Sequence, residues 1–145
     1  MRIVVQRSLE ASCEVEGKIT GKIDKGLVLL VGFTEGDNEE IIKHMVKKVL
    51  NLRIFDDENG VMNKSIDTEN AAILSISQFT LYGDATKGNR PSYIRALPGD
   101  KAIKLYEYFN QELSKSIRVE KGIFGAEMKI SLVNDGPITI LLEME

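Results

Sequence analysis

Residues 132–142, LVNDGPITILL, decide how the C-terminal part of the chain folds, and they carry two conflicting signals. Asn134-Asp135-Gly136 between two apolar runs predicts a tight hairpin turn. Pro137 follows directly, where the returning strand would begin, and proline has no N–H group for a strand ladder. Two readings of the Gly136–Pro137 bond are open. It is either a trans bond that opens an edge strand, or a cis bond that reverses the chain and directs its carbonyl oxygens outward.

The strand expected after this segment, PITILLEM, is apolar at nearly every position. A strand that is apolar on both faces must be covered on both faces. One small domain offers little such cover, so an interface with a second subunit is expected here.

Strands dominate the rest of the chain, and two amphipathic helices interrupt them. Strand-like stretches precede and follow the helices: RIVVQRS, ASCEVEG, KITGKI, LVLLVGF, AAILSISQFTL, IRVEKGIFG, AEMKISLV and ITILLEM. Apolar stripes predict one helix from Asp37 or Asn38 to about Leu52, and a second from Pro98 or Asp100. We therefore predict a single α+β domain over residues 1–145. Its sheet is expected to be mostly antiparallel, or a partial β-barrel, with both helices packed on it.

The amino-acid composition limits the kinds of partner that the protein is expected to bind. The chain is 43% hydrophobic and 28% charged, with a net charge of −3. That balance argues against a protein that grips a long stretch of nucleic acid, but not against one that holds a nucleic-acid end. No apolar run is long enough for a membrane span, and no secretory signal is seen, so the cytoplasm is expected. The single cysteine, Cys13, reads as a small buried residue in a reducing compartment.

Several common kinds of catalytic site are missing from the sequence. There is no glycine-rich phosphate loop. With one histidine and one cysteine, a zinc site of the His/Cys type cannot be built. His44 falls on the wet face of the first helix, which argues against a Ser-His-Asp triad. No cofactor and no metal are expected.

The stretch SISQFTLYGD brings polar side chains to the end of an apolar strand. Alternation places Ser77 and Phe79 on one face and Gln78 and Thr80 on the other. This pattern fits a strand end that is exposed to solvent. It also fits a polar rim beside a pocket, where N–H groups and hydroxyls polarise a substrate carbonyl or bind a water molecule. Thr80 as a nucleophile would need a nearby base, and none is evident.

Segments along the whole chain resemble the signature segments of the D-aminoacyl-tRNA deacylase family. They occur in order and without a missing block: MRIVVQR, LNLRIFDDENGVMN, SQFTLYGD, KGNRPSY and GIFGAEMKISLVNDGP. SQFT and NDGP are short, but together, at this separation and in a chain of this length, they are specific. One departure is Ile138, where valine is expected, and both are β-branched strand residues.

The resemblance implies a homodimer with a barrel-like fold that acts on the 3′ end of D-aminoacyl-tRNA. It implies hydrolysis of the ester that joins a D-amino acid to the terminal adenosine, without a metal. The residues implied at the reaction centre are Ser77, Gln78, Phe79 and Thr80. Backbone N–H groups of Phe79 or Thr80 would stabilise the oxyanion, and the ribose 2′-hydroxyl would help to activate water.

The resemblance also gives Gly136 and Pro137 a role as a cis element that reaches into the partner subunit's pocket. An L side chain would collide with this element, so L-aminoacyl esters would be excluded sterically. D side chains would point outward and be tolerated broadly. Glycine has no side chain to collide and should be admitted.

Phe124 and Met128 match family positions that would line the adenosine pocket, or alternatively they are ordinary core residues. Separately from the resemblance, Lys87, Arg90 and Arg95 give the long loop between the strand and the second helix a local positive charge. They would contact tRNA phosphates, or alternatively belong to a solvated loop. The rival to an enzyme is a non-catalytic dimeric module that binds a nucleotide or amino acid in the same pocket.

Overall fold

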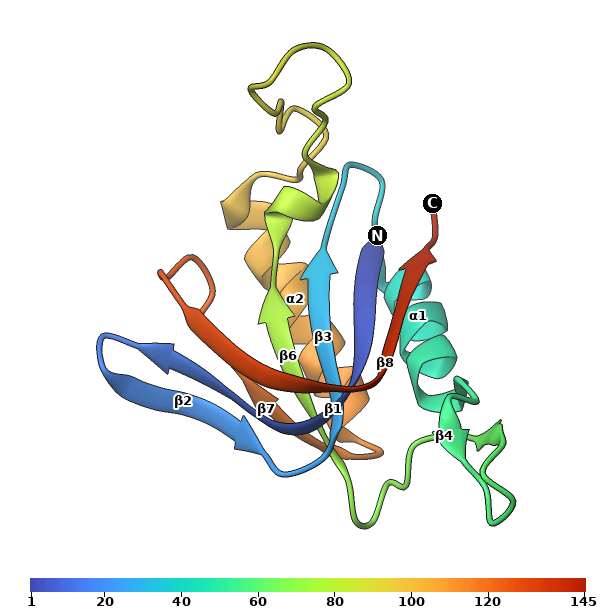
Figure 1. The fold of residues 1–145 in the computed structure, drawn as a ribbon. Helices are drawn as coiled ribbons and strands as arrows, with labels where there is room; N and C mark the ends of the chain where they lie inside the picture. The colour runs from blue at the N-terminus through green and yellow to red at the C-terminus, as the bar shows by residue number, and fades with distance from the viewer.

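The computed structural model describes residues 1–145, and Figure 1 shows one curved sheet with two long helices against it. In chain order the elements are β1 (Arg2–Val15), β2 (Lys18–Ile23), β3 (Gly26–Gly32), α1 (Glu39–Asn51), β4 (Phe55–Asp56), β5 (Met62–Lys64), β6 (Ala72–Ser77), the 3-10 turn η1 (Phe79–Tyr82), α2 (Gly99–Ser114), β7 (Arg118–Lys121) and β8 (Lys129–Glu143). The small β4–β5 hairpin after α1 was not predicted as a pair of strands.

The sheet is mixed: most of its strand pairings are antiparallel, as predicted, but two are parallel, which was not predicted. Its order is β2-β1-β3-β6-β7, with β8 paired to β1. The pairs that involve β1 are antiparallel, whereas β3 with β6 and β6 with β7 are parallel. The reason is the position of the helices, because each parallel pair is joined by a crossover that contains α1 or α2. The α+β class and the barrel-like curvature are as predicted.

The first predicted pair of strands is one long strand. β1 runs from Arg2 to Val15 and bends, so that its first half lies between β3 and β8 and its second half between β2 and β8. The bend carries β2 and the start of β8 over the sheet, and β2 then approaches β7, which nearly closes a barrel (Figure 1). Glu16 and Gly17 form the turn between β1 and β2, and both residues have positive φ.

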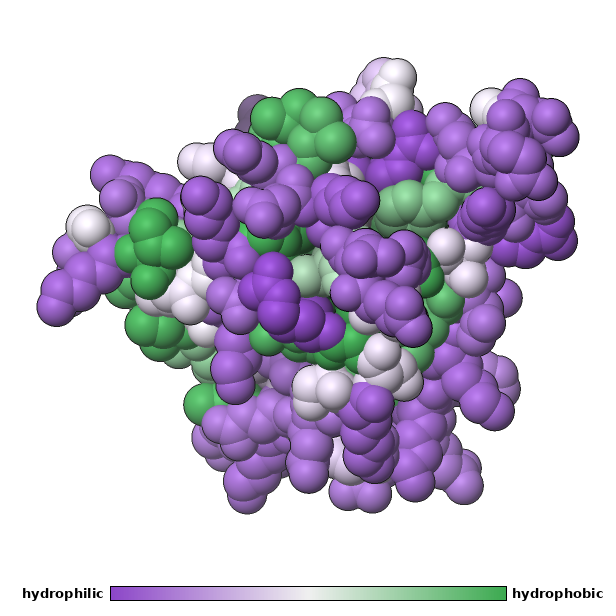
Figure 2. All heavy atoms as spheres, turned by 90° about the horizontal axis from the view of Figure 1, so that it is seen from below, coloured by the Kyte–Doolittle hydropathy of each residue, from purple (hydrophilic) through white to green (hydrophobic).

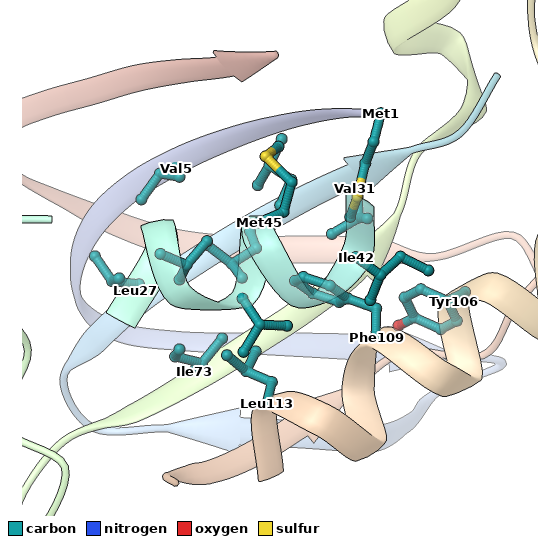
Figure 3. Close-up of a cluster of buried hydrophobic side chains, with 14 of the residues drawn as sticks. Met1, Val5, Leu27, Val31, Ile42, Met45, Ile73, Tyr106, Phe109 and Leu113 are labelled. Atoms are coloured by element: carbon teal, nitrogen blue, oxygen red, sulfur yellow. The ribbon is translucent and has the colours of Figure 1, made fainter. Parts of the chain in front are cut away.

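Two cores occupy the two faces of this sheet. The larger one lies between the sheet and the helices, where side chains of β1, β3 and β6 meet those of α1 and α2 (Figure 3). The smaller one fills the barrel and includes Cys13, Val28, Leu74 and Ile76. Because β3 is covered on both faces, its continuous apolar sequence is explained. Cys13 is fully buried, as predicted.

Both helices begin close to the predicted residues, and each buries its apolar stripe against the sheet. The Asn38 side chain accepts a hydrogen bond from the N–H of Ile41 and caps α1, and His44 is exposed. The buried face of α2 includes Tyr106, Phe109 and Leu113. Neither helix has the length and apolar character needed to cross a membrane.

Candidate active site

A cavity of about 550 Å³ opens where the parallel strands β3 and β6 end, beside the start of α2. Its wall is mostly apolar and comes from these strands, from α2 and from the segment before β8: Val31, Gly32, Phe33, Ile76, Ser77, Gln78, Phe79, Leu97, Gly99, Ala102, Phe124, Gly125, Ala126, Met128 and Ile130. This volume is typical of a small-molecule site. The few polar groups on its wall lie at the end of β6.

The polar stretch after β6 is a 3-10 turn, so the predicted strand alternation is wrong beyond Ser77. The N–H groups of Leu81 and Gly83 donate to the carbonyls of Gln78 and Thr80. In such a turn the N–H groups of Phe79 and Thr80 precede the first bonded donor and point out of its start. The strand cannot continue because Gln78, with ψ near 82°, turns the chain.

The side chains of this turn are placed differently from one another. Ser77, Gln78 and Phe79 line the cavity, whereas Thr80 is exposed and does not. The Gln78 amide donates a hydrogen bond to the Thr80 hydroxyl. That hydroxyl is therefore already engaged within the turn.

The strand that carries the turn is fixed from the helix side by Tyr106. The Tyr106 hydroxyl donates to the carbonyl of Ser75 at 2.7 Å, in the buried space between α2 and β6. Burial raises the pKa of this phenol. A neutral hydroxyl at this position therefore holds the end of β6, and with it the cavity rim, against α2.

Phe124 and Met128 both line the cavity and are half-buried. The centroid of the Phe124 ring lies 5.8 Å from that of the Tyr106 ring, and Phe124 packs on the larger core. Met128 packs on the smaller core, where a Cβ at Gly122 would run into its Sδ atom. Each of them therefore combines a core contact with a cavity surface.

The loop between η1 and α2 carries the three predicted basic residues. Lys87 and Arg90 are exposed and make no ion pair. Arg95 differs, since it pairs with Glu145 at 3.3 Å and lies 5.7 Å from the centroid of the Tyr82 ring. None of the three lines the cavity.

The NDGP segment is a bulge inside one strand, which corrects the predicted hairpin turn. β8 pairs with β1 through Asn134 and resumes at Thr139, opposite Ser8 and Gln6. Four residues of β8, 135–138, thus face the single residue Arg7 of β1. The chain continues in the same direction after the bulge, so the strands predicted on either side of it are one strand. The Gly136–Pro137 bond is cis, and both residues are exposed.

Two side chains hold the bulge. The Asn134 amide donates to the carbonyls of Arg7 and Ile138, both at 3.0 Å. The Arg7 guanidinium, 8% exposed, donates to the carbonyl of Ile54 at 2.8 Å and lies 3.2 Å from an Asp135 carboxylate oxygen. A nearly buried cation thus lies against the base of the exposed Gly136–Pro137 segment.

The bulge and the cavity lie near opposite ends of β3. Ser8, opposite the bulge, pairs with Gly26 at the start of β3, whereas the cavity is lined by Gly32 at the other end of that strand. Six residues of extended strand correspond to about 20 Å. Within one subunit the structure brings Ser77, Gln78, Phe79, Phe124 and Met128 to one cavity, and it leaves Gly136 and Pro137 away from it.

Several residues of these two regions were not assigned from the sequence. Gly99 and Ala102 of α2 line the cavity, and Arg7 and Asn134 support the bulge. The only available signal was position within quoted segments, such as Arg7 in MRIVVQR. No group of three or more His, Cys, Asp or Glu side chains comes together that could hold a metal ion.

Known proteins resemble this chain over nearly its whole length. A family model described as D-Tyr-tRNA(Tyr) deacylase matches residues 4–143. A D-aminoacyl-tRNA deacylase of Thermosipho africanus (strain TCF52B) is 55% identical over 144 residues, which are 99% of this chain and 97% of that protein.

Two solved structures share the fold over nearly their full lengths. One, described as a c-Myc DNA unwinding element binding protein, superposes with a TM-score of 0.93 at 40% identity, covering 100% of this chain and 99% of that one. The other, described as a probable eukaryotic D-amino acid tRNA deacylase, has a TM-score of 0.83 at 18% identity and covers 99% and 98%. At that identity it supports the fold alone.

An apolar cavity at the carboxyl ends of parallel strands, with N–H groups directed from a short turn at its rim, is typical of an enzyme that binds a small acyl or nucleoside group. The chain belongs to the D-Tyr-tRNA(Tyr) deacylase family. The family resemblance found in the sequence is thus confirmed, and with it the enzyme class, a hydrolase of the D-aminoacyl-tRNA deacylase type.

Proposed function

We propose that this protein hydrolyses the ester between a D-amino acid and the 3′-terminal adenosine of tRNA, releasing the D-amino acid and free tRNA. The observation that carries the proposal is the cavity at the end of β6, with the Ser77–Thr80 segment at its rim. Its volume of about 550 Å³ suits an aminoacyl-adenosine. The adenine would lie against Phe124 and Met128, which offer an aromatic face and a polarisable sulfur.

The ester carbonyl would lie against the start of η1. N–H groups of Phe79 and Thr80, directed out of the turn, would stabilise the negative charge that develops on the carbonyl oxygen. One such donor contributes about 2.7–4 kcal/mol to transition-state stabilisation in other enzymes. Support for a main-chain role is that the Thr80 hydroxyl already accepts a hydrogen bond from Gln78.

No side-chain base is required in this mechanism. The ribose 2′-hydroxyl of the substrate would orient and activate the attacking water, while Ser77 and Gln78 hold the ester in place. Positioning alone supplies about 7–11 kcal/mol in well-oriented reactions. We propose that the reaction needs no metal, so EDTA should leave turnover of D-Tyr-tRNA unchanged; a loss that added metal restores would contradict this.

Handedness would be read by Gly136 and Pro137 of the second subunit in a homodimer. Their carbonyl oxygens would stand beside the α-carbon of the substrate and leave no room for an L side chain. The support is positional: the bulge is exposed, is held by Asn134 and Arg7, and lies about 20 Å from the cavity of its own subunit. Glycine should therefore be hydrolysed, and D side chains should be tolerated broadly.

The homodimer is supported by β8. This 15-residue strand pairs only with β1, so its outer edge is free, and Val133 and Leu141 are 53% and 54% exposed. Long edge strands with apolar side chains are normally covered. The face seen from below is mostly hydrophilic, with separated apolar groups rather than one continuous patch (Figure 2).

We place the protein in the cytoplasm, where its substrate is.

The direct test is incubation of the protein with D-Tyr-tRNA and L-Tyr-tRNA in parallel. Rapid loss of the D ester alone supports the enzyme. Loss of neither ester, with tRNA still bound, would support the non-catalytic module. That alternative has one observation in its favour, since a structural relative at 40% identity is described as a DNA element binding protein.

A further inference from the structure

An exposed pair of aromatic rings stands at the rim of the cavity. Phe79, which lines the cavity, is 56% exposed, and Tyr93 from the following loop is 42% exposed. Their ring centroids are 5.2 Å apart with an interplanar angle of 73°, an edge-to-face arrangement. The proposed reaction uses only the main chain of Phe79 and does not use Tyr93.

The local backbone fixes Tyr93 in this position. A Cβ at Gly83 would come within 2.9 Å of the Tyr93 ring, so the ring packs directly on a glycine. Asp84 and Ser92 exchange two backbone hydrogen bonds of 2.8 Å and close the neck of the loop. The Asp84 carboxylate accepts from the N–H of Thr86, which lowers the pKa of that carboxyl. The aromatic pair is thus held by the fold and does not depend on the loop tip.

The loop that carries Tyr93 has more basic than acidic residues, although the whole chain has a net charge of −3. Its one carboxylate, Asp84, lies at the neck of the loop. Residues 85–99 contain Lys87, Arg90 and Arg95 and no Asp or Glu. Arg95 is occupied by Glu145, but Lys87 and Arg90 are exposed and unpaired. Two free cations thus project from the same loop whose base carries Tyr93. In Figure 1 this loop extends beyond the end of the sheet, next to η1.

Exposed aromatic rings beside free cations suit one class of partner, a single-stranded nucleic acid. Bases stack on the rings, and phosphates meet the cations. We propose that Phe79 and Tyr93 stack the unpaired nucleotides that precede the terminal adenosine of tRNA, with Lys87 and Arg90 on their phosphates. This inference rests on the proposed function, because the terminal adenosine in the cavity sets where the preceding nucleotides emerge.

The test compares D-Tyr-tRNA with D-tyrosyl-adenosine, which has the same ester but lacks the preceding nucleotides. In Tyr93→Ala we expect kcat/KM for the tRNA, relative to that for the short substrate, to fall about 5- to 100-fold. Tyr93→Phe keeps the ring and should restore the ratio. Ile94→Ala is the matched control, since Ile94 is 89% exposed beside Tyr93 but has no aromatic face; it should leave the ratio unchanged.

The charges are tested by salt dependence. A Lys87→Ala, Arg90→Ala double variant should reduce the slope of log(kcat/KM) for the tRNA against log(salt) by about 1.4, since each phosphate contact on a single strand contributes about 0.7. Lys47→Ala, on the exposed face of α1, is the control and should not change the slope.

Three results would overturn the inference. One is an unchanged substrate ratio in Tyr93→Ala. Another is a parallel loss on both substrates, which would give Tyr93 a structural role. The third is a change in the mass of Tyr93→Ala in solution, which would make the aromatic pair a contact between copies of the chain. Failure of the unaltered protein to hydrolyse either substrate would instead contradict the proposed function.

Discussion

The cavity and the β8 bulge are built in opposite ways. The cavity is enclosed by elements distant in sequence, and its wall is mostly apolar. The bulge is a local interruption of one strand pair, and its Gly136 and Pro137 are exposed to solvent. The cavity offers an apolar surface that can enclose a ligand, whereas the bulge presents an exposed segment held in place by Asn134 and Arg7. We propose that neither region is a complete site without a second chain.

The cavity side of this comparison is tested by filling the cavity. Gly99 lines it at the start of α2, and a Cβ there would meet only the Phe124 ring, at 3.8 Å. Gly99→Trp should therefore fold and place its indole where the adenosine would bind, so kcat/KM for D-Tyr-tRNA should fall by about 100-fold or more. Gly99→Ala is the control and should retain activity. Full activity in the tryptophan variant would put the substrate elsewhere.

The bulge side is tested by Gly136→Val. Gly136 has a φ of +125°, and a Cβ there would lie 2.9 Å from the backbone nitrogen of Ile138, so valine forces the bulge to rearrange. The cavity stays open, and we expect hydrolysis of both D and L esters. The remaining discrimination should be that of an ordinary pocket, about 10- to 200-fold at most.

The same Gly136→Val variant should also lose about 1–3 kcal/mol of unfolding free energy, measured by urea denaturation, because of backbone strain. The control is Gly60→Val, which also places valine at a positive φ, +74°, but has no neighbour within 4 Å of the added Cβ. It should lose stability without losing handedness. Equal loss of selectivity in both variants would show that strain in general, and not the bulge, matters.

A smaller effect is expected from the support beneath the cavity. Tyr106→Phe removes the hydroxyl that donates to the Ser75 carbonyl. We expect the unfolding free energy to fall by about 1 kcal/mol and the bulge-dependent selectivity to stay unchanged. Chemical denaturation measures the unfolding free energy, and the ratio of D-ester to L-ester hydrolysis measures the selectivity. A change of selectivity would mean that the two regions are coupled within one subunit.

The sequence identified key residues of both regions but not their local structure. Gln78 and Phe79 at the cavity and Gly136 and Pro137 at the bulge were all singled out from short polar or proline-containing segments. Both local structures were nevertheless predicted incorrectly. Residues 79–82 form a 3-10 turn where a strand was predicted, and NDGP is a bulge where a hairpin was predicted.

The reason for these errors is tertiary. Asn134 and Arg7, which hold the bulge in line with β1, are separated by 127 positions in the chain. A local turn pattern cannot register such a partner. The helices were predicted well because a cap and an apolar stripe are local, as at Asn38. The parallel pairing of β6 was missed since strand direction depends on where the crossovers pack.

The smallest expected effect concerns pH. Burial raises the pKa of Tyr82, the last residue of η1, to about 12, and the Asp37 carboxylate adds to the rise. The folded pKa thus exceeds the unfolded value of about 10. The resulting stabilisation is complete below pH 10 and is lost as pH rises toward 12.

Tyr82→Phe should therefore flatten the decline of unfolding free energy between pH 10 and 12, measured by urea denaturation at several pH values. The flattening should be partial, because the pKa of Tyr108 is also raised to about 12. An identical decline in both proteins would contradict the assignment to Tyr82.

The central claim, that each cavity is completed by the bulge of the other subunit, is tested most directly with mixed dimers. One subunit carries Gly99→Trp, which blocks its cavity, and the other carries Gly136→Val, which alters its bulge. Dimers with one subunit of each kind are isolated through two different tags. Their only open cavity faces the only intact bulge if the bulge acts across the interface. The account predicts hydrolysis of D-Tyr-tRNA with the selectivity of the unaltered protein, whereas hydrolysis of both esters, as in the Gly136→Val homodimer, would contradict it.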